Sequence, residues 1–271
     1  MLRLSAVRVA RVSIRTIRFQ RRLDGTDQYK KKSIASFTFH VMVVSITCLS
    51  AVSVAQAQTV RADRLPPDSM EERVAACVGC HGVKGEGTDN VYFPRLSGKP
   101  SGYLYNQLVA FRNGTRKYTP MNYLLEYLPD PYLKKMAQYF SDQNPAVLPA
   151  ENLPVQASVL SRGESVIKQG IPALRVPACI SCHGTNLNGR EPGIPGLLGL
   201  RADYIVAQLS AWRYGTRTAR APDCMQSIAS ALSETDVTAV SAWLASRPRD
   251  SVQRPLAISR SALPLTCGSQ Q

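Results

Sequence analysis

Two short clusters of cysteine and histidine are the residues best suited to chemistry in this chain. One reads Cys-Val-Gly-Cys-His at residues 77–81, and the other reads Cys-Ile-Ser-Cys-His at residues 179–183. On a helix, positions i, i+3 and i+4 share a face, so two thiols can reach both vinyl groups of one haem while the histidine ligates its iron. The predicted thioether residues are Cys77, Cys80, Cys179 and Cys182, and the predicted proximal ligands are His81 and His183. The sequence therefore predicts two covalently bound haem c groups.

Other uses of paired cysteines fit this pattern less well. A structural zinc site would need two cysteine pairs close together or a further histidine pair. A thioredoxin-like redox pair would start a helix within a β-α-β pattern. Here the two pairs are 102 residues apart, and a histidine directly follows each.

The sixth ligand of each iron is predicted by elimination and by spacing. The chain has three histidines, and the one outside the two clusters, His40, lies in the N-terminal segment. Ligation of either iron by two histidines of the mature chain is thus excluded. Met121 and Met225 follow their clusters at similar spacing and come after Pro120 and Pro222, so we expect both in loops as axial thioether ligands. Ligation by one histidine and one methionine gives the haem a higher reduction potential than ligation by two histidines.

The two clusters belong to a longer internal repeat. Residues 94–140 are echoed at residues 195–244, with a short insertion before the second methionine. The echoed pairs include Tyr103 and Tyr204, Gln107 and Gln208, Phe111 and Trp212, Arg112 and Arg213, and Arg116 and Arg217. A period of this length indicates a duplicated domain rather than a solenoid. The boundary is predicted within residues 144–158, which contain three prolines.

Helices are expected to position these residues, because no run alternates cleanly at a period of two. We expect a helix from Asp68 to Ala76 that leads into the first cluster. Closing helices are predicted from Asp130-Pro131 and from Ser233, where Asp236 nearly completes a capping box. Met136 falls on the apolar face of the first closing helix and is assigned to the core. Five tyrosines of the first copy are assigned mainly to packing: Tyr118, Tyr123, Tyr127, Tyr132 and Tyr139.

The N-terminal 57 residues are predicted to be a signal peptide. They hold ten basic and two acidic residues, followed by an apolar run that ends in Ala55-Gln56-Ala57. The apolar stretch is shorter than the ~20 residues that span a bilayer, which favours cleavage after Ala57 over a membrane anchor. Most of the formal charge of +14 lies in this segment, which weakens a nucleic-acid-binding interpretation.

Two cysteines of the predicted mature chain remain outside the clusters. Spare cysteines in an oxidising, exported compartment most often pair, so a disulfide between Cys224 and Cys267 is predicted, with two separate thiols as the alternative. The echoed residues Arg112, Arg213, Arg116, Arg217, Tyr103 and Tyr204 are candidates to hydrogen-bond haem propionates, with a solvated face as the alternative.

Taken with the repeat, these motifs resemble the cytochrome c4 family of dihaem proteins. The resemblance implies an all-α protein of two tandem class I cytochrome c domains, each wrapped around one covalent haem. Its predicted parts are a signal peptide (1–57), a first domain (58–147), a linker (148–158), a second domain (159–249) and a tail (250–271). The resemblance implies Cys77, Cys80, Cys179 and Cys182 as thioether sites and His81, Met121, His183 and Met225 as iron ligands.

The function that the family implies is one-electron transfer in the periplasm, often at the membrane surface. Its donor would be a quinol-oxidising complex or a dehydrogenase, and its acceptor a terminal oxidase of a respiratory chain. The protein itself is predicted to be an electron carrier without catalysis of its own. The alternatives are the haem subunit of a periplasmic dehydrogenase complex and a dihaem peroxidase. A peroxidase would need an open iron site.

Overall fold

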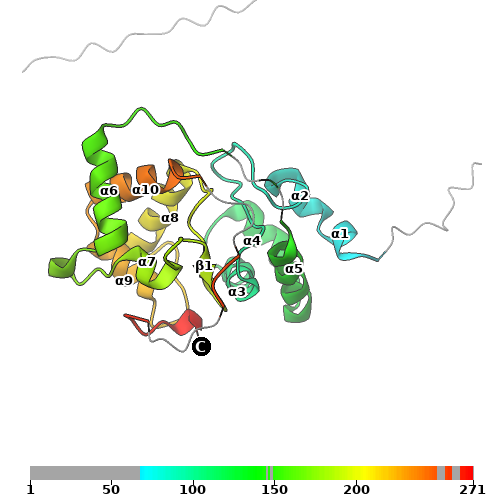
Figure 1. Cartoon of the computed structure of the whole chain (residues 1–271). Helices are drawn as coiled ribbons and strands as arrows, with labels where there is room; N and C mark the ends of the chain where they lie inside the picture. Colours follow the sequence, from blue (N-terminus) through cyan, green and yellow to red (C-terminus); the bar gives the residue numbers. More distant parts are fainter. Residues whose placement is uncertain (1–67, 145, 147–148, 249–253, 258–262, 271) are drawn as a thin grey trace, which may run out of the picture. The chain divides into compact units, whose positions relative to one another are not determined.

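The computed structural model describes residues 68–144, 146, 149–248, 254–257 and 263–270. The predicted signal peptide, residues 1–57, and its cleavage site lie outside the described residues. Most of the described chain is helical (Figure 1). The first series of helices is α1 (Met70–Arg73), α2 (Ala75–His81), α3 (Ser101–Arg112), α4 (Thr119–Leu125) and α5 (Asp130–Asp142). In the part of the chain that the structure describes, no helix is long and apolar enough to cross a membrane.

The second series begins with α6 (Ala157–Gln169), which contacts α10 as α1 contacts α5. It continues with α7 (Cys179–His183), α8 (Ala202–Arg213), α9 (Cys224–Ala231) and α10 (Glu234–Ala245), with short 3-10 helices at Pro172–Leu174 and Gly268–Gln270. The sheet found among the described residues is a two-stranded antiparallel pair, β1 (Gly189–Arg190) and β2 (Ile194–Pro195). Helix α6 begins inside the segment that the sequence assigns to the linker, and the limits of the domains stay predictions.

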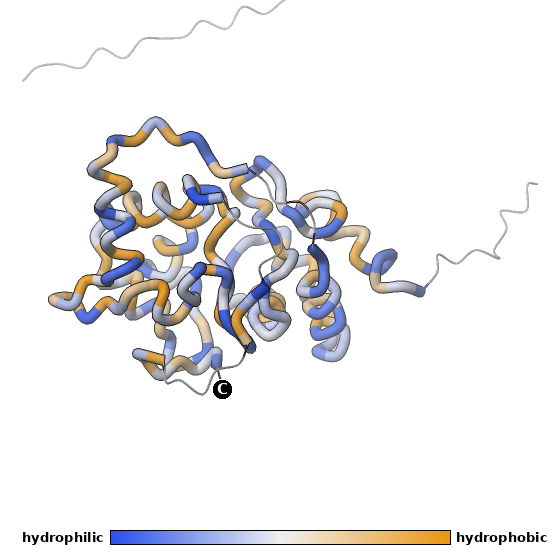
Figure 2. The backbone as a smooth tube through the Cα atoms, in the orientation of Figure 1, coloured by the Kyte–Doolittle hydropathy of each residue, from blue (hydrophilic) through white to orange (hydrophobic). Residues whose placement is uncertain are grey.

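Each series has its own hydrophobic cluster. The first gathers buried residues from α3, α4 and α5, among them Met136, as predicted, and Phe140. The second gathers buried residues from α6, α8, α9 and α10, among them Ile167 and Trp243. Polar and apolar residues alternate along the helical tubes in Figure 2, as expected for helices that bury one face.

The predicted starts of α5 and α10 agree with the structure, whereas the helix expected over residues 68–76 differs. Helix α5 begins at Asp130 with a proline in its first turn. The capping box of α10 is complete, because Ser233 Oγ accepts from the Asp236 amide and the Asp236 carboxylate accepts from the Ser233 amide. The single helix expected over residues 68–76 is instead two, α1 and α2, separated at the fully buried Val74. The first cysteine cluster lies within α2.

A close crossing of α6 and α10 depends on Gly163. A Cβ atom at this position would lie 2.2 Å from the carbonyl oxygen of Ala239 and 2.8 Å from Cβ of Trp243. Gly163→Ala is therefore expected to lower the free energy of unfolding by about 1–3 kcal/mol, because the helices must separate. Denaturant unfolding measures this. Ser165→Ala on the same helix is the control and should change stability by less than about 0.5 kcal/mol; equal stabilities for the two variants would contradict the tight crossing.

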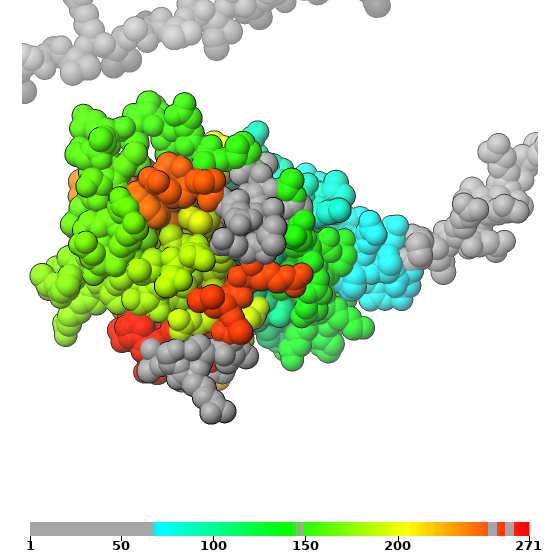
Figure 3. Space-filling model, in the orientation of Figure 1, coloured from blue at the N-terminus to red at the C-terminus, as the bar shows by residue number. Residues whose placement is uncertain are grey.

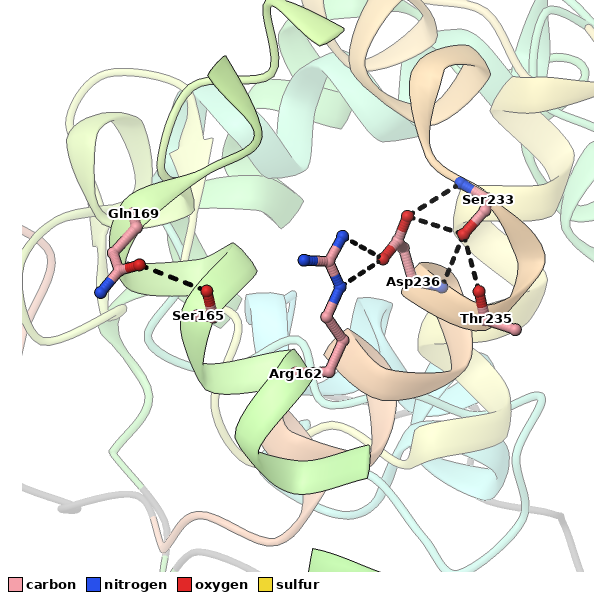
Figure 4. Close-up of polar contacts among 6 residues, drawn as sticks. All are labelled: Arg162, Ser165, Gln169, Ser233, Thr235 and Asp236. Carbon is pink, nitrogen blue, oxygen red and sulfur yellow. Dashed lines mark hydrogen bonds and ion pairs between the residues drawn. The ribbon is translucent and has the colours of Figure 1, made fainter. Parts of the chain in front are cut away.

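Asp236 ties the start of α10 to α6 (Figure 4). Its carboxylate lies 2.7 Å from Arg162 Nη2 and accepts from the Ser233 hydroxyl at 2.6 Å. Burial alone would raise the pKa of Asp236, but the hydrogen bonds from Ser233 and Arg162 outweigh it and hold the pKa below 3.8. The carboxylate therefore adds stability above pH 3.8, and this contribution is lost as the pH falls through the lower pKa of the folded state.

Replacement of this carboxylate should show the same dependence on pH. Asp236→Asn is expected to cost about 1–2 kcal/mol of unfolding free energy at pH 7, since hydrogen bonds to a charged group are lost. Denaturant curves for wild type and variant should converge at acid pH. A difference that stays constant down to about pH 2 would contradict the assigned role.

Candidate haem sites

The first cysteine cluster ends in a buried, oriented imidazole. His81 is the last residue of α2 and is 6% exposed. Its Nδ1 lies 2.8 Å from the carbonyl oxygen of Pro94, which can only accept, so Nδ1 carries the proton and Nε2 is left for a metal. Burial lowers the pKa of His81, which favours the neutral form that binds iron.

The second cluster reproduces this geometry. His183 ends α7, is 7% exposed and has its Nδ1 2.8 Å from the carbonyl oxygen of Pro195. Burial again lowers the pKa of the imidazole. Sequence reasoning found both histidines but not their carbonyl partners. The two prolines stand among the echoed residues, but the acceptors are backbone carbonyl groups that any residue at those positions would present.

The four cysteines of the clusters form no disulfide in the structure. Each is half-buried and faces a cavity. Burial raises the pKa of Cys77 and Cys182, and raises that of Cys179 to about 11.

A cavity adjoins each cluster, and each cavity brings together the residues that the sequence selected. The first contains Cys77, Cys80, His81 and Met121 in its wall. Its volume is about 760 Å³, within the ~300–1,000 Å³ usual for ligand pockets. The other residues that line it are mostly apolar, including Leu104 and Phe111 from α3 and Leu125 from α4.

The second cavity has a smaller volume, about 170 Å³, and is lined by the corresponding cysteine, histidine and methionine residues. Its wall contains Cys179, Cys182, His183 and Met225. Trp212 also lines it, and the indole Nε1 of Trp212 is buried with no hydrogen-bond partner among the described residues. A buried donor of this kind needs an acceptor, and a haem carboxylate would supply one. In both cavities the residues present fit a covalently attached haem with one histidine and one methionine ligand.

The two methionines do not lie in loops, as the sequence suggested. Met121 lies in the first turn of α4, and Met225 in the first turn of α9. Pro120 occupies the first turn of α4, where a missing amide hydrogen costs nothing. Asp223 caps α9 by accepting from the amide of Gln226. The loop prediction was wrong because these local capping signals start helices immediately at the ligands.

Polar residues of both series meet between the cavities. Arg116 is 8% exposed, and its guanidinium donates to Gln107 at 3.0 Å within its own series. The same guanidinium donates across to the Tyr204 hydroxyl at 2.9 Å and to Gln208 Oε1 at 2.7 Å. The first series is thus joined to the second by a buried cation.

Arg217 makes the reciprocal contacts. It is 3% exposed, donates to Gln208 at 2.8 Å, and reaches across to Gln107 Oε1 at 2.6 Å and to the Tyr103 hydroxyl at 3.4 Å. Burial and the nearby Arg116 lower the pKa of Arg217 to about 10. Burial would raise the pKa of Tyr103, but the two guanidiniums outweigh it and lower that pKa.

Neither buried guanidinium forms a salt bridge with a carboxylate of the described residues. Buried charges are normally paired, and both arginines line the first cavity, while Arg217 also lines the second. This arrangement supports propionate contacts for Arg116 and Arg217. It does not for Arg112, whose guanidinium pairs with Asp130 at 2.7 Å.

The packing assignment of the tyrosines was wrong for Tyr123 and Tyr127, which are 76% and 85% exposed.

The remaining two cysteines of the described residues are joined. Cys224 and Cys267 form a disulfide that links the first turn of α9 to the C-terminal tail. Cys224 directly precedes Met225 in the sequence, so this bond lies next to the second methionine.

Comparison with known proteins agrees with this geometry. A cytochrome c family model matches residues 72–146. The chain is 34% identical to the thiosulfate dehydrogenase electron acceptor of Thiomonas intermedia over 183 residues, which covers 68% of this chain and 81% of that protein. It is 34% identical to cytochrome c4 of Pseudomonas aeruginosa over 176 residues, or 64% of this chain and 85% of that protein. The chain belongs to the cytochrome c4 family.

A solved structure extends the match to the fold. Reduced cytochrome c4 from Pseudomonas stutzeri aligns with a TM-score of 0.57 and 32% identity, covering 65% of this chain and 95% of that one. The all-α, class I cytochrome c fold is therefore confirmed. This c4-type cytochrome is a dihaem electron carrier with covalently bound haem c, as its two Cys-x-x-Cys-His clusters indicate.

Proposed function

We propose that this c4-type cytochrome is exported to the periplasm and passes single electrons through two haems, each ligated by one histidine and one methionine. One observation carries the proposal. Each cavity gathers two free thiols, a buried imidazole with a free Nε2, and a methionine from a different helix. No other residue type is needed for covalent attachment and two axial ligands.

The chain's residues would act by holding the redox centres rather than by catalysis. When bound, each haem supplies an iron that changes reversibly between Fe(III) and Fe(II). His81 and His183 are fixed by the carbonyl oxygens of Pro94 and Pro195, so their Nε2 atoms stay oriented during the change of charge. Apolar walls exclude water and limit reorganisation. A methionine on the sixth position disfavours the peroxidase alternative, which needs an open site.

The buried polar cluster between the cavities supports electron transfer from one haem to the other. Arg116 and Arg217 each contact both series, so they hold the two cavities adjacent. Their positive charges would also stabilise propionates on both sides. By holding the two cavities adjacent, the shared cluster would favour rapid electron transfer between the two haems.

The partners are proposed from chemistry and from relatives. We propose a quinol-oxidising complex or a dehydrogenase as donor and a terminal oxidase as acceptor in a respiratory chain, with association at the membrane surface. The name of the Thiomonas relative, an electron acceptor of thiosulfate dehydrogenase, favours a dehydrogenase as donor and keeps open the alternative of a haem subunit in a dehydrogenase complex. Tyr123 and Tyr127, exposed on and beside α4, would offer a contact surface.

The proposed ligation and transfer can be tested together. The exported protein should show near-infrared bands of methionine-ligated ferric haem equivalent to two irons, and its N-terminus should begin after Ala57. Stopped-flow mixing with a purified thiosulfate dehydrogenase and its substrate thiosulfate, which supplies the electrons, should then reduce both haems. Protein with methionine bands from neither iron would contradict the ligand assignment, and retention of residues 1–57 would contradict cleavage. Failure with that one enzyme, but reduction by a quinol-oxidising complex, would select the other donor.

A further inference from the structure

The two methionine-bearing helices are held in place by different devices. Four residues separate Arg116 from Met121, but seven separate Arg217 from Met225. The arginines occupy equivalent places, since residues 116 and 217 pair as an isolated antiparallel bridge. The second ligand is therefore reached by a longer loop, which has more conformational freedom to lose.

In the first series, one side chain next to the ligand fixes the shorter loop. Asn122 accepts a hydrogen bond from the amide of Tyr118 at 2.8 Å. Its amide group also donates to the carbonyl oxygens of Arg116, at 3.0 Å, and of Phe111 at the end of α3. Asn122 thus connects the residue after Met121 to both ends of the loop.

The equivalent position in the second series is Gln226, and its side chain makes no such set of bonds among the described residues. Its backbone amide is capped by Asp223, which also accepts from the amide of Ala219 at 2.6 Å. These contacts organise the last turn before α9, but they do not connect it to α8. A further element also contacts the longer loop.

That element is the tail segment 263–270. Gly268 is buried, its amide donates to the carbonyl oxygen of Pro222 at 3.0 Å, and a Cβ atom here would lie 2.2 Å from the carbonyl oxygen of Ala221. Only a glycine allows this approach. The disulfide from Cys267 to Cys224 then fastens the segment one residue before Met225. The longer loop is therefore held from outside by the tail.

The tail also reaches the wall of the second cavity and the first series. Cys267, Ser269 and Gln270 line the cavity beside Met225. The carbonyl oxygen of Ser269 accepts from Asn106 of α3 at 3.4 Å. Upstream, Leu256 pairs with β1, because its amide donates to Gly189 and its carbonyl oxygen accepts from Glu191, both at 2.9 Å. In Figure 3 these orange-red and red segments lie on the surface against the yellow-green residues of the second series.

We propose that the tail segment 263–270 and its Cys224–Cys267 disulfide are the positioning element for Met225, doing in the second series what Asn122 does in the first. The inference rests on the proposed axial roles of Met121 and Met225. Loss of the disulfide frees the long loop. It therefore lowers the fraction of molecules in which Met225 ligates the iron of the second haem. Loss of the Asn122 side chain does the same to the first haem only.

The test compares two variants of the full-length, haem-loaded protein. Cys224→Ser with Cys267→Ser removes the disulfide and leaves no unpaired thiol to compete in haem attachment, and Asn122→Ala is its counterpart. Near-infrared spectra and a redox titration follow both haems. The variants Met121→Leu and Met225→Leu show which spectral band and which potential belong to which haem. Mass spectrometry confirms two haems per chain, and hydrogen exchange of residues 263–270 confirms release of the tail.

We expect reciprocal results. The double serine variant should weaken the methionine band and lower the reduction potential of the second haem only, while Asn122→Ala should do so for the first haem only. The inference is overturned if the serine variant releases its tail but keeps both methionine bands and both reduction potentials. The proposed ligation still stands in that case, provided that the wild type shows both bands. Should the variant fail to accumulate, wild-type protein that has been reduced, alkylated at the disulfide and reoxidised at iron gives the same comparison. If wild type lacks the bands, the proposed ligation itself fails.

Discussion

Replacing Cys179 and Cys182 together with serine is expected to yield a chain that carries one haem instead of two. The two thiols face the second cavity, and no other described cysteine beside His183 is a free thiol, since Cys224 and Cys267 are paired. Without thioethers the haem is held by axial ligands alone and is lost on denaturation. Intact mass spectrometry under denaturing conditions should show the loss of one haem mass.

The mirrored variant and a matched control make this result specific. Cys77→Ser with Cys80→Ser should lose the other haem, and the pyridine haemochrome absorbance should halve in each case. Cys224→Ser with Cys267→Ser also removes two cysteines but should keep both haems. Covalent retention of two haems by either cluster variant would show that the attachment sites are assigned wrongly.

Replacing Met121 with leucine is expected to lower the reduction potential of one haem by on the order of 0.1 V, out of the ~0.8 V range that axial ligands set. The thioether stabilises the ferrous state relative to harder or weaker ligands. Leucine fills a similar volume in the cavity wall but cannot ligate, so the sixth position opens. A redox titration should show one displaced wave and one unchanged wave, and carbon monoxide should bind the reduced variant at one iron.

Met136 provides the control for this substitution. It is 4% exposed in the core of the first series and belongs to α5. Met136→Leu keeps the packing volume, and volume-conserving swaps usually cost less than about 1.5 kcal/mol. Both potentials should therefore remain. A displaced wave in Met136→Leu, with none in Met121→Leu, would exchange the roles of the two residues.

The sequence selected the candidate site residues that the structure brings together in each cavity, but it did not indicate most of the contacts that hold them. The cysteine, histidine and methionine residues could be chosen because a Cys-x-x-Cys-His cluster has few other uses, and because Met121 and Met225 follow the two clusters at similar spacing. The capping box at Ser233 could be predicted because it depends on residues only three positions apart. Local signals of this kind are read without knowledge of tertiary structure.

The supports depend on contacts between distant segments, which periodicity does not encode. Arg116 and Arg112 both recur in the repeat, yet only the packing of α3 beside Asp130 shows that Arg112 has a carboxylate partner while Arg116 has none among the described residues. Asn122 gave no signal, because its counterpart in the repeat is Gln226. The carbonyl oxygens of Pro94 and Pro195 are backbone groups, and any residue at those positions would present one.

One measurement tests the central claim most directly: intact mass and near-infrared spectroscopy on the same sample of purified protein from cells with working cytochrome maturation. Two haems of added mass per chain, with methionine-to-iron bands equivalent to two ferric centres, are the predicted result. A chain with the bare polypeptide mass, or two attached haems without those bands, would contradict it.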